Sequence, residues 1–262
     1  MIVVSSSAVV GSSALSSSLL RAASLQQSQS RSTSSYPHLD HSVVKVAIAG
    51  QDYEESWGIG TMRRQLECRR HLAPDQERPV PTSQDWAYLR RVYHQTVQTK
   101  PTVKDTTESA FRVPYEIRHD PVKGRGIYAT TDIPKGTVIW TRTQSYSITT
   151  ASDFRRFIFS IPNQDGLACD VLLWWYVFEQ ADGHHEIVFD LNDGALMNNS
   201  GSSQEPNNGC WVSNNNDNHL DCFYHQFAIQ DIAAGDEMTA RYKDFEVPGG
   251  RKALQEFGIA LK

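Results

Sequence analysis

The pattern of apolar and polar residues along this chain changes near residue 110. Upstream, apolar side chains recur at i, i+3, i+7 and i+11 over residues 83–98, which is the period of an amphipathic helix. The stripe consists of Trp86, Leu89, Tyr93 and Val97, with Arg90 and Arg91 turned away. It predicts one helix near 84–98 that docks on the neighbouring domain. Residues 43–49 predict a single short strand, and the polar residues 99–110 predict a linker.

Downstream of residue 110, short β-prone runs are separated by turn residues. The predicted strands are 113–118, 126–129, 137–140, 171–178, 186–191 and 222–229, with 171–178 and 186–191 forming a hairpin. Helices are expected at 153–159 and at 250–261, the second closing the chain. Many short strands with few helices predict a mainly β (α+β) fold.

The first forty residues differ in composition from the rest. They are rich in serine, contain Arg21 and Arg31, and have no acidic residue before Asp40. This composition is typical of an organelle transit peptide, mitochondrial in the first instance and plastid as the alternative. A Ser-rich disordered tail has the same composition and would leave the protein in the cytoplasm or nucleus. Serines interrupt every apolar run, so no membrane span is expected here.

Charge and cysteine usage exclude several classes of protein. A net charge of −5 argues against a surface that binds nucleic acid throughout. The four cysteines are too few and too widely spaced for a disulfide framework, and no pair has zinc-site spacing: Cys68, Cys169, Cys210 and Cys222. We therefore expect reduced thiols and no metal. Residues 61–72 are locally basic, which fits a face for nucleic acid or acidic lipid but fits a solvated helix face better.

Three separated blocks carry the candidate chemistry. The first is Lys123-Gly124-Arg125-Gly126, followed by the turn Asp132-Ile133-Pro134-Lys135-Gly136. The second is Asn198-Asn199-Ser200, followed by Pro206-Asn207. The third is Gly235-Asp236-Glu237-Met238-Thr239, which leads to Tyr242. In this order and at this spacing, residues 113–245 resemble the SET domain of protein lysine methyltransferases.

The resemblance implies a SET-like β-clip fold, made of several short sheets with a knot-like crossing, and S-adenosylmethionine as the cofactor. The implied cofactor-binding residues are Lys123, Gly124, Arg125, Gly126, Asn198, Asn199 and Tyr242. Glycine has no Cβ, so the two glycines would let main-chain groups approach the methyl donor. The Asn198 amide would hydrogen-bond the adenine. Tyr242, at the junction of the donor and substrate pockets, is the candidate catalytic residue.

Three departures from the family pattern stand beside this resemblance. Asn199 occupies a position where the family usually has His, and Ala240 one where it commonly has Phe or Tyr. No cysteine follows Tyr242, so the zinc-bound segment after many such domains is missing. The implied substrate channel would be lined by Ala240, Phe245 and Phe257.

The implied function is methyl transfer from S-adenosylmethionine to a lysine of a protein or peptide substrate. Two alternatives stay open: a degenerate SET fold that only binds a peptide or protein partner, and an enzyme acting on a small amine. The expected organisation is a transit-like or disordered segment 1–40, an extension and linker 41–110, the SET domain 111–246 and a C-terminal helix 247–262. The substrate protein, the number of methyl groups added and the oligomeric state are not predicted.

Overall fold

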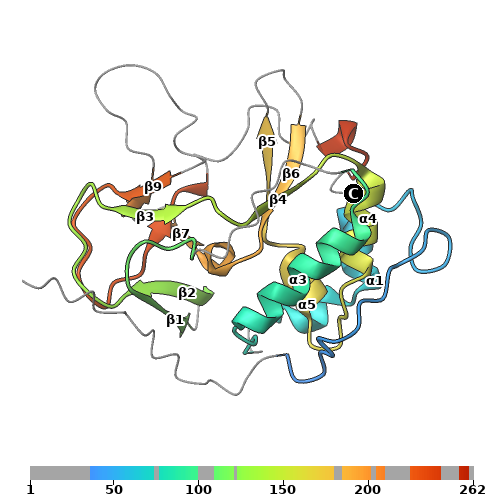
Figure 1. Cartoon of the computed structure of the whole chain (residues 1–262), viewed down its shortest axis with the longest axis horizontal. Coiled ribbons are helices and arrows are strands. Elements are labelled where there is room, and N and C mark those ends of the chain that lie inside the picture. Colours follow the sequence, from blue (N-terminus) through green and yellow to red (C-terminus); the bar gives the residue numbers. More distant parts are fainter. Residues whose placement is uncertain are drawn as a thin grey trace, which may run out of the picture. The chain divides into compact units, whose positions relative to one another are not determined.

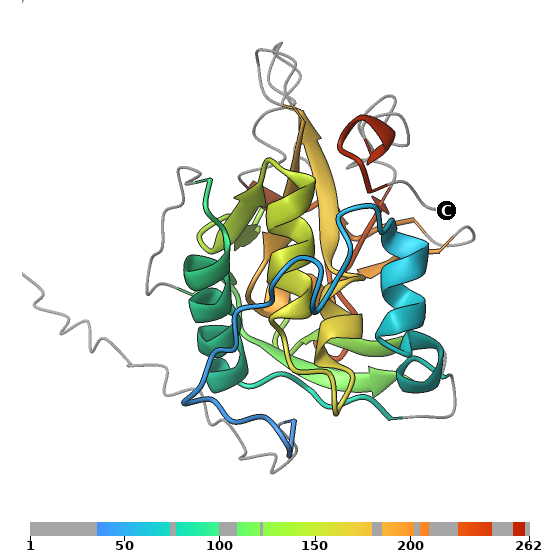
Figure 2. The same ribbon diagram turned by 90° about the vertical axis from the view of Figure 1, so that its right-hand side faces the viewer.

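The computed structural model describes residues 36–73, 77–99, 109–120, 123–179, 185–201, 205–209, 225–242 and 254–259. They belong to one compact unit, Ser34–Lys262. Short sheets form most of its candidate SET region, and the helices gather on the other side of the unit (Figure 1). Figure 2 looks onto this helical side. No helix in the described ranges has the length and apolar character needed to cross a membrane.

Four small sheets make up the β structure. In the first, β1 (Tyr115–Asp120) pairs antiparallel with β2 (Gly124–Ala129). In the second, β9 (His225–Ala228) lies between β3 (Val138–Thr141) and β8 (Asn208–Gly209). In the third, β6 (His185–Asp190) lies between β4 (Ser145–Ile148) and β5 (Trp175–Glu179). In the fourth, β7 (Asn198–Asn199) pairs parallel with β10 (Thr239–Ala240). The predicted mainly β fold of several short sheets is confirmed.

The helices are short except for the one that the apolar stripe predicted. They are α1 (Ile59–Gln65), α2 (Cys68–His71), α3 (Ser83–Thr96), α4 (Ala151–Phe159), α5 (Leu167–Val171) and the 3-10 turn η1 (Asp193–Leu196). Helix α3 begins with a capping box, in which Thr82 and Asp85 satisfy each other's main-chain N–H groups. Its buried face is wider than predicted, because Tyr88 and Val92 are also fully buried. Arg90 does not turn away from the core side entirely, since its guanidinium donates to the Leu191 carbonyl.

One hydrophobic core joins the N-terminal helices to the sheets. Tyr93 of α3 makes edge contacts with Tyr146 of β4 and Phe157 of α4, with ring centroids 4.9 and 5.8 Å apart. Phe157 in turn lies 5.2 Å from Phe189 of β6. Burying aromatic side chains of this size contributes about 1.5–3 kcal/mol each. Helix α3 is thus part of the same core as the sheets.

Several predicted elements differ from those observed. Residues 43–49 form no strand and contribute only an isolated bridge, from Ala49 to Tyr53. The first hairpin arm starts at Trp175 instead of residue 171, because Leu167–Val171 is helical. In the C-terminal segment, Gly258 has φ +79°, which ends the helical turn before residue 261. Tyr36 is only 1% exposed, so folded structure starts before residue 40.

The prediction of reduced thiols was wrong for one pair of cysteines. Cys68 of α2 and Cys169 of α5 form a disulfide, with their Cα atoms 5.3 Å apart. The two residues are 101 positions apart in the sequence, and only the packing of α2 against α5 brings them together. Spacing along the chain cannot reveal such a pair. Cys210 and Cys222 lie outside the described residues.

Candidate functional site

The three sequence blocks meet at Glu237. Its Oε2 accepts a hydrogen bond from Lys123 Nζ at 2.6 Å, and its Oε1 accepts one from Asn198 Nδ2 at 2.8 Å. Asn198 Nδ2 also donates to the Arg125 carbonyl oxygen at 2.9 Å. Residues from β2, β7 and the segment before β10 are therefore held together by one carboxylate and one amide, and β7 lies beside β2 (Figure 1).

The main chain around Glu237 extends the β2 edge. Met238 N donates to Ile127 O at 2.7 Å, and Ala129 N donates to Asp236 O at 2.9 Å. This pairing fixes the position of the Glu237 main chain beside β2. Its side chain is turned toward Gly126, since a Cβ placed on Gly126 would lie 2.5 Å from Glu237 Oε1 and 3.1 Å from Asn198 Nδ2. Any larger residue at position 126 would displace both groups.

Gly124 is required for a related reason. It has φ +85°, a conformation that L side chains rarely adopt, and a Cβ there would lie 2.6 Å from Arg78 Nη2. The space left open by the two glycines is therefore filled by the protein's own side chains. The close approach of the methyl donor to these glycines stays a prediction.

Arg125 is buried, and protein groups surround its guanidinium. Nη2 lies 2.8 Å from Asp170 Oδ1, Nη1 lies 3.3 Å from Tyr36 Oη, and the ring of Trp174 lies 5.4 Å away. The guanidinium also donates to the Pro79 carbonyl. Burial alone would lower the pKa of Arg125, but the negative charge of Asp170 outweighs burial and raises this pKa above its ordinary value, so the side chain stays a cation. Because the Arg125 guanidinium is occupied by these protein groups, the predicted role in cofactor binding falls to the Arg125 main chain.

Tyr242 is fixed at both ends by the second block. Its main-chain N–H donates to Asn199 Oδ1 at 3.2 Å, and its hydroxyl donates to the Met197 carbonyl at 3.0 Å. Asn199, which replaces the usual family His, thus contacts the candidate catalytic residue through its side chain. Half of the Tyr242 surface is exposed. Burial of its hydroxyl end, and then the charge of Glu237, raise the pKa of Tyr242, so the hydroxyl stays protonated at neutral pH.

Asn207 holds the crossing between the second and third blocks. Its Nδ2 donates to the Glu237 carbonyl at 2.7 Å, and its Oδ1 accepts from Thr239 N at 2.8 Å. Ser200 N then donates to Ala240 O at 3.0 Å, which continues the parallel pairing of β7 with β10. The sequence prediction assigned no role to the Asn207 side chain, although the Pro206-Asn207 pair was its signal.

The structure describes two of the three predicted channel residues. Ala240 is 3% exposed in β10, and Phe257 is partly buried against the main core. Phe245 lies outside the described residues. Among the parts of the chain that the structure describes, no group of three or more His, Cys, Asp or Glu side chains could hold a metal ion.

Comparison with known proteins agrees with the geometry. Residues 124–243 match the family model described as SET domain. A crystal structure of a candidate histone methyltransferase from Plasmodium falciparum is similar at 19% identity and a TM-score of 0.30. The match covers 50% of this chain and 94% of that chain, and at this level of likeness it carries no further argument. No curated protein matches this sequence.

Proposed function

We propose that this chain, whose residues 124–243 match the SET-domain family model, transfers a methyl group from S-adenosylmethionine to the side-chain amine of a lysine in a protein substrate. The observation that carries the proposal is the double fixation of Tyr242, by Asn199 at its main chain and by Met197 at its hydroxyl. These contacts hold the Tyr242 hydroxyl beside the second block, where the resemblance implies the junction of the donor and substrate pockets.

The residues present suit the donor in two respects. Both hydrogens of Asn198 Nδ2 are used within the protein, while its Oδ1 accepts no hydrogen bond from the described residues. A carboxamide oxygen is a suitable partner for the amino group of adenine. The Tyr242 hydroxyl donates its proton to Met197, so its oxygen lone pairs remain to accept from an amine or a polarised methyl group.

The donor supplies a methyl group on a sulfonium ion, ready for in-line displacement. The protein has to align a neutral amine with that methyl group, because a protonated lysine has no lone pair. Tyr242 would orient the amine through its hydroxyl oxygen. An apolar channel lowers the pKa of a lysine by disfavouring its charge, and Ala240, which is buried, would supply one wall of it. Asn198 and Glu237 would hold the strands in register around both ligands.

The proposal is tested in two steps with the full chain. Titration calorimetry against S-adenosylmethionine measures donor binding, and no detectable heat at millimolar donor would contradict the proposed cofactor. Incubation of the protein with labelled donor and a cell extract, read by intact mass, then measures methyl transfer. Normal donor binding without transfer to any protein, peptide or small amine would favour the non-catalytic binding module.

A further inference from the structure

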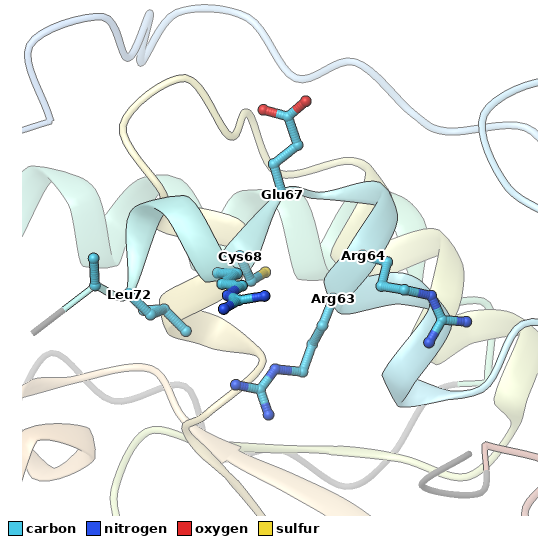
Figure 3. Close-up of a pocket in the computed structure, with 7 residues that line it drawn as sticks. Arg63, Arg64, Glu67, Cys68 and Leu72 are labelled. Atoms are coloured by element: carbon cyan, nitrogen blue, oxygen red, sulfur yellow. The ribbon is translucent and has the colours of Figure 1, made fainter.

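A basic pocket of about 560 Å³ lies on α1 and α2, and none of the residues that line it belongs to the three blocks (Figure 3). Three arginines line it, namely Arg63, Arg64 and Arg69, with Glu67 as the single acid. Arg64 donates to Thr61 at 2.8 Å, whereas the guanidiniums of Arg63 and Arg69 have no partner among the described residues. Glu67 is directed to Arg70, 3.8 Å away.

The charge of this pocket selects its ligand chemistry. Guanidinium groups bind carboxylates through paired hydrogen bonds, and three of them around one opening favour an anion over a neutral or cationic molecule. The whole chain has a net charge of −5, so this attraction is a local property of the pocket.

The same pocket reaches one half of the disulfide. Cys68 contributes to the pocket lining and is bonded to Cys169. Cys68 is 1% exposed, so attack on it requires α2 to open. That helix has only four residues, a single turn that buries only Cys68, which is the kind of element that opens locally at low cost.

We propose that Cys68–Cys169 is a thiol–disulfide exchange site, and that the arginine pocket admits a small thiol bearing carboxylates as its reductant. The thiolate of the reductant attacks Cys68 Sγ, the Cys68–Cys169 bond breaks, and a mixed disulfide on Cys68 and a Cys169 thiolate form. A second molecule of the thiol attacks the reductant's sulfur in the mixed disulfide. This step releases the oxidised reductant, in which the two thiol molecules are joined by a disulfide, and a Cys68 thiolate. The two cysteines gain two electrons from the reductant and two protons from solvent. The arginines attract the anion and stabilise a departing Cys68 thiolate.

Contacts of Asp170 connect the disulfide to strand β2. Cys169 directly precedes Asp170, whose carboxylate binds Arg125 of β2 at 2.8 Å, Arg78 at 2.9 Å and Tyr36 at 2.8 Å. Arg78 in turn lies against Gly124. Opening the disulfide frees α5 from α2 and so loosens the carboxylate that holds Arg125.

The first test measures reduction rates on the full chain by alkylation and intact mass. Glutathione, 2-mercaptoethanol and cysteamine represent anionic, neutral and cationic thiols, and each rate is expressed per thiolate. We expect the ratio of the glutathione rate to the 2-mercaptoethanol rate to fall about fivefold in the triple variant Arg63→Gln/Arg64→Gln/Arg69→Gln. Lys45→Gln, which removes an exposed cation outside the pocket lining, is the control and should leave the ratio unchanged.

Each result decides the proposal. A fall of twofold or more that is specific to the pocket arginines, and that is also seen in wild type at 0.5 M salt, supports it, because salt screens the attraction. A smaller fall, or unpaired Cys68 and Cys169 in the air-oxidised protein, overturns it.

The second test follows amide hydrogen exchange before and after reduction. Residues 123–129 should exchange faster in the reduced protein, while residues 185–190 of β6 serve as the internal control. Equal protection of β2 in both states would overturn the link through Asp170. Neither test uses a methyl donor, so both give an answer even if the proposed function fails.

Discussion

Tyr242 combines a half-exposed ring with a hydroxyl whose proton is already donated to Met197. If that oxygen orients the amine only near the transition state, its removal lowers turnover and leaves binding intact. We expect Tyr242→Phe to lower kcat about 10–100-fold, because the loss of one hydrogen bond in the transition state raises the activation free energy by about 1.4–2.8 kcal/mol. Donor affinity and the free energy of unfolding should change little. Kinetics by mass spectrometry and calorimetry measure the two quantities.

Tyr88→Phe is the matched control for this variant. The Tyr88 hydroxyl is buried in α3 and has no hydrogen-bond partner in the part of the chain that the structure describes. Its removal should leave turnover unchanged. Equal turnover in Tyr242→Phe and wild type would remove Tyr242 from the catalytic assignment.

Asn198 has two roles in the proposal. Its side chain holds together the strands that would surround the donor, and its oxygen would bind the donor itself. In Asn198→Ala, the Arg125 carbonyl and Glu237 lose a donor inside a partly buried site. We expect a loss of about 1–3 kcal/mol in the free energy of unfolding, together with weaker donor binding. Urea denaturation and calorimetry check the two effects. Asn199→Ala, which removes one exposed contact to Tyr242, should cost clearly less stability.

The glycines show how far single motif residues can be interpreted from sequence. The motif singled out Gly124 and Gly126 as positions that need glycine, and in the structure a Cβ there would meet Arg78 and Glu237, respectively. The partners come from residues 46 positions upstream and 111 positions downstream. No local pattern reveals which distant side chain fills a gap of this kind.

At the scale of elements, Asp153 ties the end of α3 to the start of α4. Its carboxylate accepts hydrogen bonds from Gln98 N and Thr99 N and pairs with Arg156 at 3.1 Å. Burial alone would raise the pKa of Asp153, but the hydrogen bonds from Thr99 and Gln98 and the charge of Arg156 lower it below its ordinary value. A lowered pKa means that the carboxylate stabilises the fold above the unfolded pKa of about 3.9 and loses this effect as pH falls through the folded pKa.

We therefore expect Asp153→Asn to destabilise the protein by about 1–3 kcal/mol at pH 6, and by less at pH 3, because the unfolded wild-type chain then binds a proton at this carboxyl that the folded chain binds only at lower pH. Urea denaturation of both proteins at both pH values measures the difference. Asp40→Asn is the control, because Asp40 is exposed and bonded to its neighbour Ser42. A cost for Asp153→Asn that does not shrink at pH 3 would contradict the assigned role.

Elements with a strong local signal were predicted well, and those defined by distant partners were not. Helix α3 was found from its stripe and α4 from its composition, within two or three residues at each end. Strands β7, β8 and β10 have two residues each and exist only because their partners lie alongside. Helix α5 was not predicted, and only its last residue, Val171, fell within the predicted strand 171–178, because the residues of α5 are all buried and show no period.

For the whole molecule, the resemblance covered the right segment but underestimated what precedes it. The predicted extension contributes α1, α2 and α3 to the common core and adds the disulfide to α5. The pairing of Cys68 with Cys169 and the burial of Tyr36 beneath Asp170 both depend on contacts more than 100 residues apart in sequence. Such contacts follow from the packed structure and leave no periodic trace.

We propose that the serine-rich N-terminus directs import into mitochondria or plastids, and the structure limits where it can be removed. Tyr36 is buried, and its hydroxyl donates to Asp170 at 2.8 Å, so a stable mature chain has to retain it. A reporter fused to residues 1–45 should enter an organelle, and cleavage should fall between Arg31 and Tyr36 by intact mass. Replacing Arg21 and Arg31 by Gln should weaken import, because transit peptides depend on positive charge. A diffuse cytosolic signal from the unaltered fusion would reject the transit peptide, and a mature chain starting beyond Tyr36 would contradict the role of this residue in the core.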